Sequence, residues 1–494
     1  MPSKIENEYS LDSMIKIALD LSAEKDFFRL MQKILSEAMG ICHCDAGTVY
    51  IKEKDHLDFY TVCTKSKGIL TNRNDGVAVM PPVPLTRKHV CACAAMDNKK
   101  INIPDIYGSS EYDFAGAQKY DSLNDYHTQS MLVIPMVDEK DNVIGVLQLI
   151  NSLAEDGKII PFDRRYEDVV SALASLAAVS INNHKLALEV SNLLHSFVSV
   201  MVDAIEERSS YNATHTRSMV RYADRFIDWL NETGNEWNFD EDRRDAFLMS
   251  VWLHDIGKLI VPLEVLDKPD RLGPLRDRIK SKLEVTKLNA RVDKMSNAQD
   301  AEKDDELIRK LDEAWDLIDS SNNAGFINDE KIAALKECAL IECTTPYGEK
   351  EPLLKDDELT AITVQKGTLT ADERHKVEEH VSYTARMLER MNFGGIYEQV
   401  PFWAGSHHEF INGTGYPNHL KGSEVPRETR LLTIIDIYDA LTAEDRPYKP
   451  PMPSEKAFAI LEDMSKEGRI DPDILRMFRE SGAWKKDTGE GDRQ

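Results

Sequence analysis

The stretch HHEFINGTGYP, residues 407–417, sets two adjacent imidazoles and a carboxylate directly before a turn that contains two glycines. Adjacent histidines suit a packed core poorly, because each ring carries two polar nitrogens that need partners when they are buried. Neutral imidazole is instead a common metal ligand. The stretch therefore predicts a metal site, to which other parts of the chain have to contribute further ligands.

Two further segments carry ionisable side chains in apolar surroundings. Residues 252–259, WLHDIGKL, place His254 and Asp255 side by side on an apolar helix, and Lys258 follows one turn after His254. Asp436 lies within the apolar run LLTIIDIYDAL. A buried carboxylate or ammonium without a partner costs several kcal/mol, so each of these groups needs an opposite charge or a metal.

The helical segment 372–388, DERHKVEEHVSYTARML, contributes another histidine. His380 is in register with the inward-facing stripe of Val377 and Met387, whereas His375 falls on the outer face. The sequence shows no Ser-His-Asp elbow, no Gly-rich phosphate loop and no cysteine ligands. Imidazole and carboxylate without thiolate suit Fe, Mn, Zn or Ni, and an aspartate that can bridge suits a two-metal site that clamps a phosphodiester.

Composition limits the partners and the location. The 494-residue chain has 61 Lys and Arg against 86 Asp and Glu, a net charge of −25 that repels DNA, RNA and anionic membranes. A small anionic substrate then requires a local cationic site, which bound metal ions supply. The sequence shows no apolar signal core and no run of about 18 apolar residues. We therefore expect a soluble, cytoplasmic protein.

The seven cysteines are spread over the chain without a small-domain disulfide pattern, which fits a reducing compartment. Two C-x-C pairs, Cys42/Cys44 and Cys91/Cys93, invite a metal or redox interpretation. Their one-residue spacing is not that of zinc knuckles, and cysteine is a common small buried side chain. Burial in a core is therefore the interpretation we expect.

The N-terminal part combines helical and strand patterns. Residues 10–40 repeat apolar side chains at the helical period, and AGTVYIKE (46–53) and LDFYTVCT (57–64) predict antiparallel strands. Residues 130–151, SMLVIPMVDEKDNVIGVLQLIN, predict a hairpin that turns at DEKDN. A sheet with helices at both ends is an α+β domain of a sensor-like kind.

A helix without proline or glycine is predicted over residues 163–207. About 45 residues at roughly 1.5 Å each give about 65 Å, far more than one globular domain needs. Helices of this length commonly pair as coiled coils, so we expect a homodimer through this helix. The alternative is two helices with a bend near Asn182 and Asn183.

The rest of the chain, from about residue 201 to 465, is rich in helical patterning. Within it, residues 273–365 are highly charged, and a narrow apolar stripe that includes Leu307, Leu311 and Ile318 predicts a helical hairpin with one buried face. We expect a solvated spacer here, with a partner-docking arm or a lid as the alternatives.

These segments resemble two families. The order YHTQSMLVIPM, IGVLQLIN, FDRRYEDVVSALASLAAVSINN (126–183) resembles a GAF domain over about residues 20–188. HDIGK (254–258), HHEFINGTGYP and DIYDALTAEDRPYK (436–449), in this order, resemble an HD-GYP domain, the branch of HD-type metal phosphohydrolases that cleaves bacterial cyclic dinucleotides. The resemblance implies an α+β N-terminal GAF sensor domain joined by a long helix to an all-α HD-type metal phosphohydrolase domain.

The predicted boundaries follow the two resemblances. They are 1–188 for the GAF-like domain with its N-terminal helices, 189–207 for the connecting helix, 196–272 and 366–466 for the HD-GYP domain, 273–365 for the charged insertion and 467–494 for a C-terminal tail.

The resemblance also implies roles for individual residues. The family's metal ligands fall on His215, His254, Asp255, His380, His407, His408 and Asp436. Asp255 is the expected bridge between the metals, and Lys258 matches the lysine that contacts the scissile phosphate or the solvent at the metals. Tyr416, Arg446 and Lys449 match residues that hold the bases and phosphates of the substrate.

Some details of the site lie outside the ligand set. Tyr211 stands where a subset of the family has a glutamate that helps to hold a third metal, so we expect two divalent ions. The resemblance suggests Fe or Mn, and Zn or Ni stay open. We expect Glu409 to orient a ligand imidazole. Gly413 and Gly415 are expected to allow positive φ in the turn.

The implied function is hydrolysis of cyclic di-GMP to pGpG or to GMP, regulated by a small molecule in the GAF domain. One alternative keeps the enzyme and changes the substrate to cyclic GMP-AMP or another phosphoester. A second alternative is a degenerate HD-GYP protein that senses a dinucleotide or recruits partners. A GAF domain that only dimerises and binds no ligand also stays open.

Overall fold

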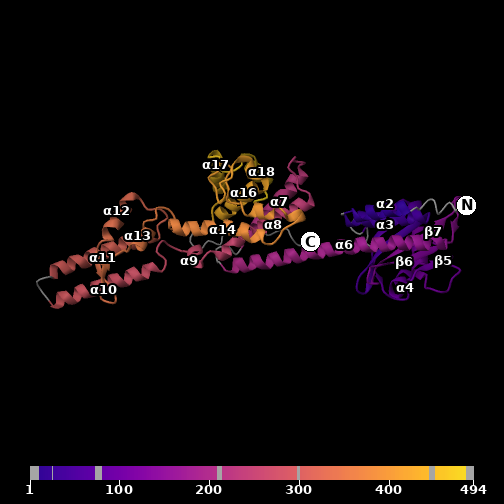
Figure 1. Ribbon diagram of the computed structural model, residues 1–494, viewed down its shortest axis with the longest axis horizontal. Coiled ribbons are helices and arrows are strands. Elements are labelled where there is room, and N and C mark those ends of the chain that lie inside the picture. The colour runs from indigo at the N-terminus through magenta and orange to yellow at the C-terminus, as the bar shows by residue number, and fades with distance from the viewer. Residues whose placement is uncertain are drawn as a thin grey trace. The chain divides into compact units, whose positions relative to one another are not determined.

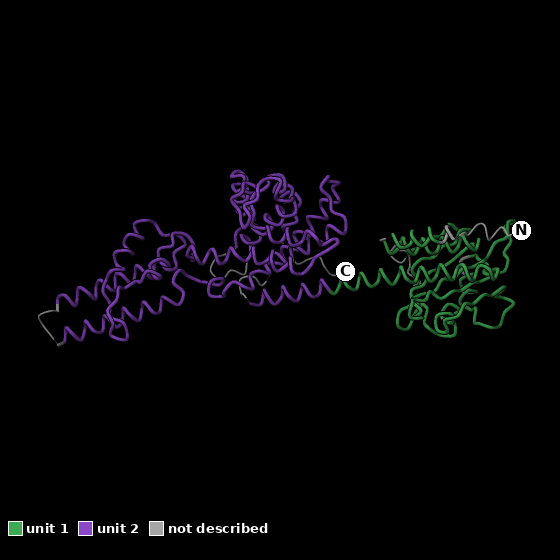
Figure 2. Tube along the Cα trace, viewed as in Figure 1, with its two compact units in different colours: residues 1–193 green, residues 194–494 purple. Residues whose placement is uncertain are grey.

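The chain forms two compact units, residues 1–193 and residues 194–494, drawn green and purple in Figure 2. The computed structural model describes residues 11–24, 26–72, 81–208, 214–296, 301–443 and 451–485. Unit 1 combines a sheet with helices, and unit 2 is dominated by helices. The fold class expected from the sequence is therefore confirmed.

Unit 1 is built on an antiparallel sheet. Its strands are β1 (Cys44–Lys52), β2 (His56–Thr64), β3 (Ile69–Asn72), β4 (Val83–Pro84), β5 (Ile101–Ile103), β6 (Met131–Val137), β7 (Val143–Leu153) and β8 (Ile159–Ile160). The order is β3-β2-β1-β7-β6-β5, with β4 beside β2 and β8 beside β7. The hairpin predicted at DEKDN is confirmed between β6 and β7, where the Asp138 carboxylate accepts hydrogen bonds from the backbone N–H groups of Lys140 and Asn142.

Helices cover both faces of this sheet (Figure 1). They are α2 (Leu11–Ser22), α3 (Phe27–Ile41), η1 (Lys65–Lys67), α4 (Val90–Asp97), α5 (Ala115–Asn124) and the first half of α6 (Arg164–Arg208). α3 and α6 bury Ile34 and Leu173 in one core with the sheet. α4 buries Cys91 and Cys93 in a second core on the opposite face. Burial raises the pKa of Cys91 to about 12, so this thiol is a packed apolar group and not a thiolate ligand.

A cavity of about 520 Å³ lies between the sheet and α4 in unit 1. Aromatic rings of Tyr50, Phe59 and Tyr126 line it, together with the imidazole of His89 and the amide of Gln148. The Tyr50 hydroxyl donates a hydrogen bond of 3.0 Å to Oε1 of Gln148. A cavity of this size, largely apolar with a few polar groups, is suited to a small organic ligand.

Helix α6 runs unbroken for 45 residues, Arg164–Arg208. The long connecting helix is thereby confirmed, and the alternative of a bend near Asn182 is wrong because the helix continues through it. Its first half buries Val170 in the core of unit 1, and its second half buries Val202 in the core of unit 2. Among the described residues, α6 is also the one helix whose length and composition would allow a membrane span.

Unit 2 packs its helices around one large core. They are α7 (His215–Glu232), α8 (Glu241–Leu253), η2 (Ile256–Ile260), α9 (Leu263–Leu266), α14 (Ala371–Glu389), η3 (Gly395–Tyr397), α15 (Val400–Ala404), η4 (Gly422–Glu424), α16 (Arg427–Thr442), α17 (Ser454–Lys466) and α18 (Pro472–Ser481). α16 is buried on nearly every side, which explains why its sequence is apolar without a polar face. α18 buries Ile474 and Phe478 in the same core. The expected tail from residue 467 is therefore wrong for the residues through α18, which are part of unit 2.

The charged insertion has its own small core. Its elements are α10 (Leu275–Ser296), α11 (Ala301–Asn322), α12 (Asp329–Cys338), β9 (Glu342–Thr344), β10 (Lys350–Pro352) and α13 (Asp356–Ile362). α10 and α11 form the predicted helical hairpin, with Leu311 and Ile318 buried. The two-stranded sheet of β9 and β10 was not predicted, because strands of three residues are too short to show a period.

Arg271 joins the two ends of the insertion. Its side chain is fully buried, and no carboxylate pairs with it in the described part of the chain. Its guanidinium donates hydrogen bonds to the backbone carbonyls of Ser321, Asn322, Ala324, Val364 and Gln365. Residues 272 and 364 are therefore held together, which lets a long segment enter and leave unit 2 at one place.

Candidate metal centre

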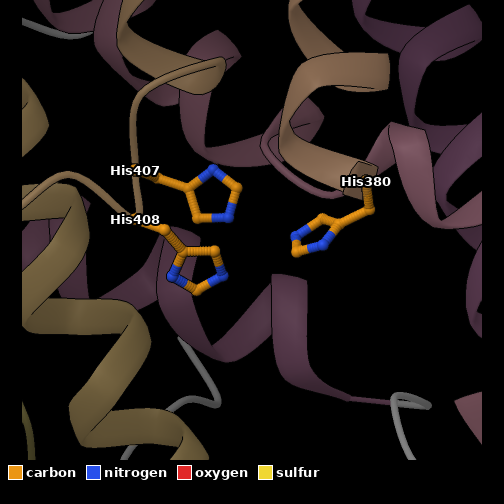
Figure 3. A group of neighbouring side chains, drawn as sticks. All are labelled: His380, His407 and His408. Carbon is orange, nitrogen blue, oxygen red and sulfur yellow. The ribbon is translucent and has the colours of Figure 1, made fainter. Parts of the chain in front are cut away.

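The seven side chains predicted as metal ligands lie together in unit 2, although five separate segments carry them. His215 begins α7, His254 and Asp255 follow α8, His380 is in α14, His407 and His408 follow α15, and Asp436 is in α16. Six of the seven are buried, and His408 is partly exposed. Figure 3 shows the rings of His380, His407 and His408 directed toward one another.

Asp255 lies between two groups of histidines. Its Oδ2 is 3.2 Å from Nε2 of His254 and 3.8 Å from Nε2 of His215. Its Oδ1 is 3.2 Å from Nε2 of His380 and 3.9 Å from Nε2 of His407. A carboxylate that turns one oxygen toward each group could serve as a ligand in both groups.

Each group by itself has the spacing of a metal site. The potential ligand atoms of His215, His254 and Asp255 all lie within 4.8 Å of one another, and so do those of His380, His407 and His408. Asp436 adds its Oδ1 to the first group, 3.3 Å from Nε2 of His215. Its Oδ2 lies 3.8 Å from Nδ1 of His408 in the second group.

Backbone hydrogen bonds set the orientation of three rings. His254, His380 and His407 each donate from Nδ1 to the carbonyl oxygen of the residue three positions earlier. The distances are 2.7 Å to Val251, 2.5 Å to Val377 and 2.7 Å to Ala404. The proton therefore sits on Nδ1, and the lone pair of Nε2 faces the site.

The buried Nε2 atoms of His254, His380 and His407 have no hydrogen-bond donor. They face carboxylate oxygens, which are acceptors as well. Buried acceptors that face only acceptors are unfavourable, because each has lost water without gaining a partner. A cation between them removes this cost, so the residues present fit a metal centre.

The ionisation states also suit ligands. Burial lowers the pKa of His408 to about 4. Burial also lowers the pKa of His407 well below its usual value, and the neighbouring His408 and His254 lower it further. Burial alone would raise the pKa of Asp255, but attraction by Lys258 and His254 prevails and holds it well below the usual range. At neutral pH these groups are neutral imidazoles and an ionised carboxylate, the forms that bind metals.

The sequence prediction missed Asp439. This buried carboxylate accepts a hydrogen bond of 2.7 Å from Nδ1 of His215 and so points Nε2 of that ring at the site. Burial lowers the pKa of His215, but Asp436 and Asp439 outweigh it and raise the pKa to about 10, so a metal would have to displace a proton from this ring. The signal was present: Asp439 lies three residues after Asp436, on the same face of an apolar helix.

A glycine allows the segment with His254 and Asp255 to dock on α14. A Cβ on Gly257 would lie 1.9 Å from the carbonyl oxygen of His380 and 2.7 Å from N of Thr384. The Thr384 hydroxyl accepts from N–H of Gly257 and donates to the carbonyl of His254. The glycine of HDIGK is therefore required by a close backbone approach that brings His254 and His380 to one site.

Lys258 lies at the site beside Asp255. Its Nζ is 2.6 Å from Oδ2 of that carboxylate. The last residue of α6, Arg208, donates hydrogen bonds of 3.2 Å to the backbone carbonyls of Lys258 and Val261, and another to that of Leu259. The end of the long helix is thus tied directly to the short helix η2 that carries Lys258.

The turn after the histidine pair differs in part from expectation. The Glu409 carboxylate accepts hydrogen bonds from the backbone N–H groups of Asn418 and Leu420, so the prediction that it orients an imidazole is wrong. Gly413 has the expected positive φ of 80°. Gly415 does not have a positive φ. A Cβ on Gly415 would lie 2.3 Å from N of Phe410, so the close approach of the backbone excludes a side chain there.

The remaining site predictions have mixed outcomes. The ring of Tyr416 lies 4.9 Å from that of His408, at the edge of the site. His375 and His419 are exposed and away from it, as expected. Arg446, Lys449 and Tyr211 lie outside the described residues.

Two protein families match separate parts of this chain. Residues 26–181 match the family described as GAF domain, and residues 357–474 match the family described as HD domain. These parts of the chain are therefore similar to a GAF domain and to an HD domain. The HD match begins inside the insertion, so His215, His254 and Asp255 precede it, although the fold brings them to the same site. An HD domain implies a divalent metal site, and the His and Asp groups described above fit one.

Curated relatives of the HD domain are phosphodiesterases by name. A 3'3'-cGAMP-specific phosphodiesterase 3 of Vibrio cholerae is 37% identical over 24% of this chain and 25% of its own length. A cyclic di-GMP phosphodiesterase of Thermotoga maritima is 34% identical over 24% of this chain and 31% of its own length. The cyclic di-GMP phosphodiesterase response regulator RpfG of Xanthomonas campestris is 27% identical over 47% of this chain and 62% of its own length. The matches thus span less than two thirds of each relative.

Proposed function

We propose that the protein is a metal-dependent phosphodiesterase that hydrolyses cyclic di-GMP to pGpG, to GMP or to both. The observation that carries the proposal is the arrangement of the seven ligand side chains, in which Asp255 lies between two groups of histidines and three buried Nε2 atoms have no donor. The HD domain of this proposal is formed by residues 196–272 and 366–466, on both sides of the insertion.

The residues divide into two ligand sets. His215, His254, Asp255 and Asp436 would hold one divalent ion, and His380, His407, His408 and the second oxygen of Asp255 the other. Imidazole and carboxylate ligands suit Fe or Mn, the pair we propose, and also admit Zn or Ni. Two bound ions would supply an activated water and stabilise the charge on the phosphate that is attacked.

The protein's own groups supply the rest of the chemistry. The ammonium of Lys258, held beside Asp255, would contact a phosphate oxygen and stabilise the charge that develops in the transition state. The ring of Tyr416, beside His408, would stack on or hydrogen-bond to a base at the edge of the site. We assign Arg446 and Lys449 to the phosphates of the substrate, in line with the resemblance of their segment.

The substrate class follows from the relatives. The named activities of the matching relatives are divided between cyclic di-GMP and 3'3'-cGAMP, both cyclic dinucleotides. Cyclic GMP-AMP is therefore the second candidate substrate. A degenerate protein that only senses a dinucleotide is disfavoured, because every residue of the ligand set is present in the sequence and six of the seven fall into two groups with the spacing of metal ligands.

Partners and location are part of the proposal. A small molecule in the cavity of the GAF domain would regulate turnover, and two chains would associate through α6. We place the protein in the cytoplasm, without a DNA, RNA or membrane partner, on the strength of its charge of −25.

The test combines metal content with turnover. The protein is stripped with a chelator and reloaded with Mn or Fe, and hydrolysis of cyclic di-GMP and cyclic GMP-AMP is measured on one preparation. We expect no turnover without metal and recovery of turnover with two ions per chain. In His407→Ala we expect loss of turnover and of the two-ion metal content. His375→Ala, which changes an exposed histidine of α14, is the matched control. Full turnover in the metal-free protein would contradict the proposal.

A further inference from the structure

Two buried threonine hydroxyls join segments that carry the candidate metal ligands. Thr384 lies in α14, four residues after His380, and Thr433 lies in α16, three residues before Asp436. The side chain of Thr384 is fully buried, and Thr433 keeps only 2% of its surface exposed. A buried hydroxyl is unfavourable unless it is hydrogen-bonded, so the partners of these two groups indicate their role.

Thr384 attaches the segment after α8 to α14. Its hydroxyl accepts a hydrogen bond of 3.0 Å from N–H of Gly257 and donates one of 2.9 Å to the carbonyl oxygen of His254. In the part of the chain that the structure describes, this carbonyl has no other donor. The hydroxyl uses both its donor and an acceptor site, so a valine of the same shape cannot make these bonds. They fix the backbone of His254 relative to the helix that carries His380.

Thr433 attaches the histidine pair to α16. Its hydroxyl lies 2.7 Å from the carbonyl oxygen of His407 and 2.9 Å from that of Thr429, one turn earlier in the same helix. A bond to the carbonyl four residues earlier is common for a threonine in a helix. The shorter bond, to His407, crosses to another segment, and no other donor to this carbonyl occurs among the described residues. The bond fixes the backbone of His407 relative to the helix that carries Asp436.

Each hydroxyl joins one ligand group to the other. His254 and Asp436 belong to the group of His215, whereas His407 belongs to the group of His380. In both cases the two ligand-bearing elements that the hydroxyl connects would therefore serve different ions. Neither hydroxyl joins two ligands of the same group. Ligand sets act together only when surrounding bonds hold them close to their bound geometry, and these two bonds hold the separation between the groups.

Two further contacts complete the connection of the ligand segments. A Cβ on Gly405 would lie 2.6 Å from Cβ of Ala385, so the end of α15 docks on α14 directly beside Thr384. The hydrogen bond from His215 to Asp439 attaches α7 to α16. All five segments that carry ligands are thereby attached to one another by contacts of the protein itself. Within this set, the two threonine hydroxyls are the hydrogen bonds that link one ligand group to the other.

Thr429 provides a comparison on the same helix. It lies one turn before Thr433 and is also fully buried, but its hydroxyl has no hydrogen-bond partner among the described residues. Removal of that hydroxyl therefore breaks no bond, whereas removal of the Thr433 hydroxyl leaves the carbonyl of His407 without its donor. The two positions thus separate the effect of the hydrogen bond from the effect of a polar atom in the core.

We propose that Thr384 and Thr433 are positioning residues whose hydroxyls set the separation of the two ligand groups, and with it the ability of the site to hold two ions as a pair. Neither residue is a ligand itself; each acts through the backbone of a ligand histidine. The inference rests on the function proposed above, because it assigns both residues to the same metal centre.

The first experiment needs no metal. Hydrogen exchange of the full chain, stripped with a chelator, is followed by mass spectrometry of its peptides. Thr384→Val should speed exchange in residues 254–260 roughly 10-fold, and Thr433→Val should do so in residues 404–410, because each loses one buried hydrogen bond. Thr384→Ser and Thr433→Ser keep the hydroxyl and should exchange like the parent, as should Thr429→Val. Parental exchange in both valine variants would overturn the inference.

The second experiment measures the ion pair. On titration with Mn, the parent should bind two ions per chain and give the electron paramagnetic resonance spectrum of a coupled pair. Each valine variant should bind the second ion about 10–100-fold more weakly and lose the coupled spectrum.

The serine variants should keep the pair, and so should Ile434→Val, which trims the buried α16 without removing a hydrogen bond and controls for a general loss of stability. A coupled pair of parental affinity in both valine variants, or its loss in the serine variants as well, would overturn the inference alone. A parent that binds no Mn would overturn the proposed function and this role together, so the two failures are distinguishable.

Discussion

Asp439 and His215 are 224 residues apart in the chain and are joined by a hydrogen bond of 2.7 Å in a buried part of unit 2. The bond connects the first residue of α7 to α16 and leaves Nε2 of the imidazole directed at Asp436 and Asp255. The position of one candidate ligand is therefore set by a carboxylate that binds no metal itself. Carboxylates of this kind fix the ring orientation and increase the basicity of a ligand histidine.

Replacement of Asp439 by Ala should weaken one metal site and spare the other. Without the carboxylate, His215 can turn away, and the affinity of the site that it serves should fall by about 10–100-fold. Metal titration with a stoichiometry readout checks this, and Asp463→Asn, at an exposed position of α17, is the control. Unchanged affinities at both sites would show that His215 needs no such support.

Replacement of Lys258 by Met should lower turnover by about 10²–10³-fold with two metal ions retained. The variant removes the ammonium beside Asp255 and keeps the length of the side chain. Lys258→Arg should not restore the rate, because a planar guanidinium cannot occupy the position of a compact ammonium. The measurements are kcat and metal content on the same preparation. A loss of metal in Lys258→Met would assign the residue a structural role.

Replacement of Arg208 by Met should lower turnover about 10-fold and leave the metal content unchanged. Its hydrogen bonds to the carbonyls of Lys258, Leu259 and Val261 hold η2, and a small displacement of a reacting group is costly. Arg217→Met is the control, because the exposed Arg217 pairs with the exposed Asp203 and donates no hydrogen bond to η2 in the described part of the chain. Separate measurement of kcat and KM distinguishes an effect on positioning from an effect on substrate binding. Equal rates in Arg208→Met and Arg217→Met would show that Arg208 has no role in the mechanism.

Replacement of Arg271 by Met should loosen the insertion and leave the metal centre intact. The variant removes the guanidinium that donates to five backbone carbonyls, of which those of Ser321, Asn322 and Gln365 keep a backbone N–H donor and those of Ala324 and Val364 lose the donor described here, at about 1–3 kcal/mol each. Limited proteolysis should then cut within residues 273–365 much faster than in the parent, while residues 371–443 and 451–481 stay protected. Arg309→Met, at an exposed position of α11, should behave like the parent. Protection of the insertion in Arg271→Met would contradict this role of the guanidinium.

The pair of Lys268 and Glu373 predicts a pH-dependent stability of unit 2. Burial raises the pKa of Glu373, but the hydrogen bonds and charge of Lys268 outweigh it and hold the pKa below its usual value of 4.5. A carboxyl group with a lowered folded-state pKa stabilises the fold above pH 4.5, and this contribution is lost as the pH falls through the folded-state pKa.

Glu373→Gln should therefore melt below the parent at neutral pH, and the difference should shrink below pH 4.5. Glutamine can still accept the N-terminal hydrogen bond from Thr370, so the change isolates the charge. Asp372→Asn, at the exposed neighbouring position, is the control. Melting temperatures measured across this pH range check the prediction, and a constant difference at all pH values would refute it.

Several site residues were recognisable from local patterns alone. His254, Asp255 and Asp436 are ionisable groups within apolar runs, and burial of such groups requires a partner whatever the fold. The long α6 helix and the β6–β7 hairpin follow from the absence of helix breakers and from turn chemistry. His215, by contrast, lies in a segment with no local sign of a ligand, and only the family resemblance indicated it.

The role of Glu409 shows why local patterns fail. Its position beside His408 suggested support of a ring, but its hydrogen-bond partners are the N–H groups of Asn418 and Leu420, which the path of the turn brings back to it. Gly257 and Gly415 likewise serve close approaches between segments that the sequence does not place side by side.

By itself, the sequence determined which side chains are buried and which face of each helix they occupy, because periodicity and apolar context are local properties. It also determined the order of the elements and the chemical kind of the site. Only the tertiary structure decided that Asp255 turns one oxygen to each histidine group, that Asp439 supports His215 and that Arg208 holds η2. These contacts depend on how helices distant in the chain pack, and packing is a property of the whole core.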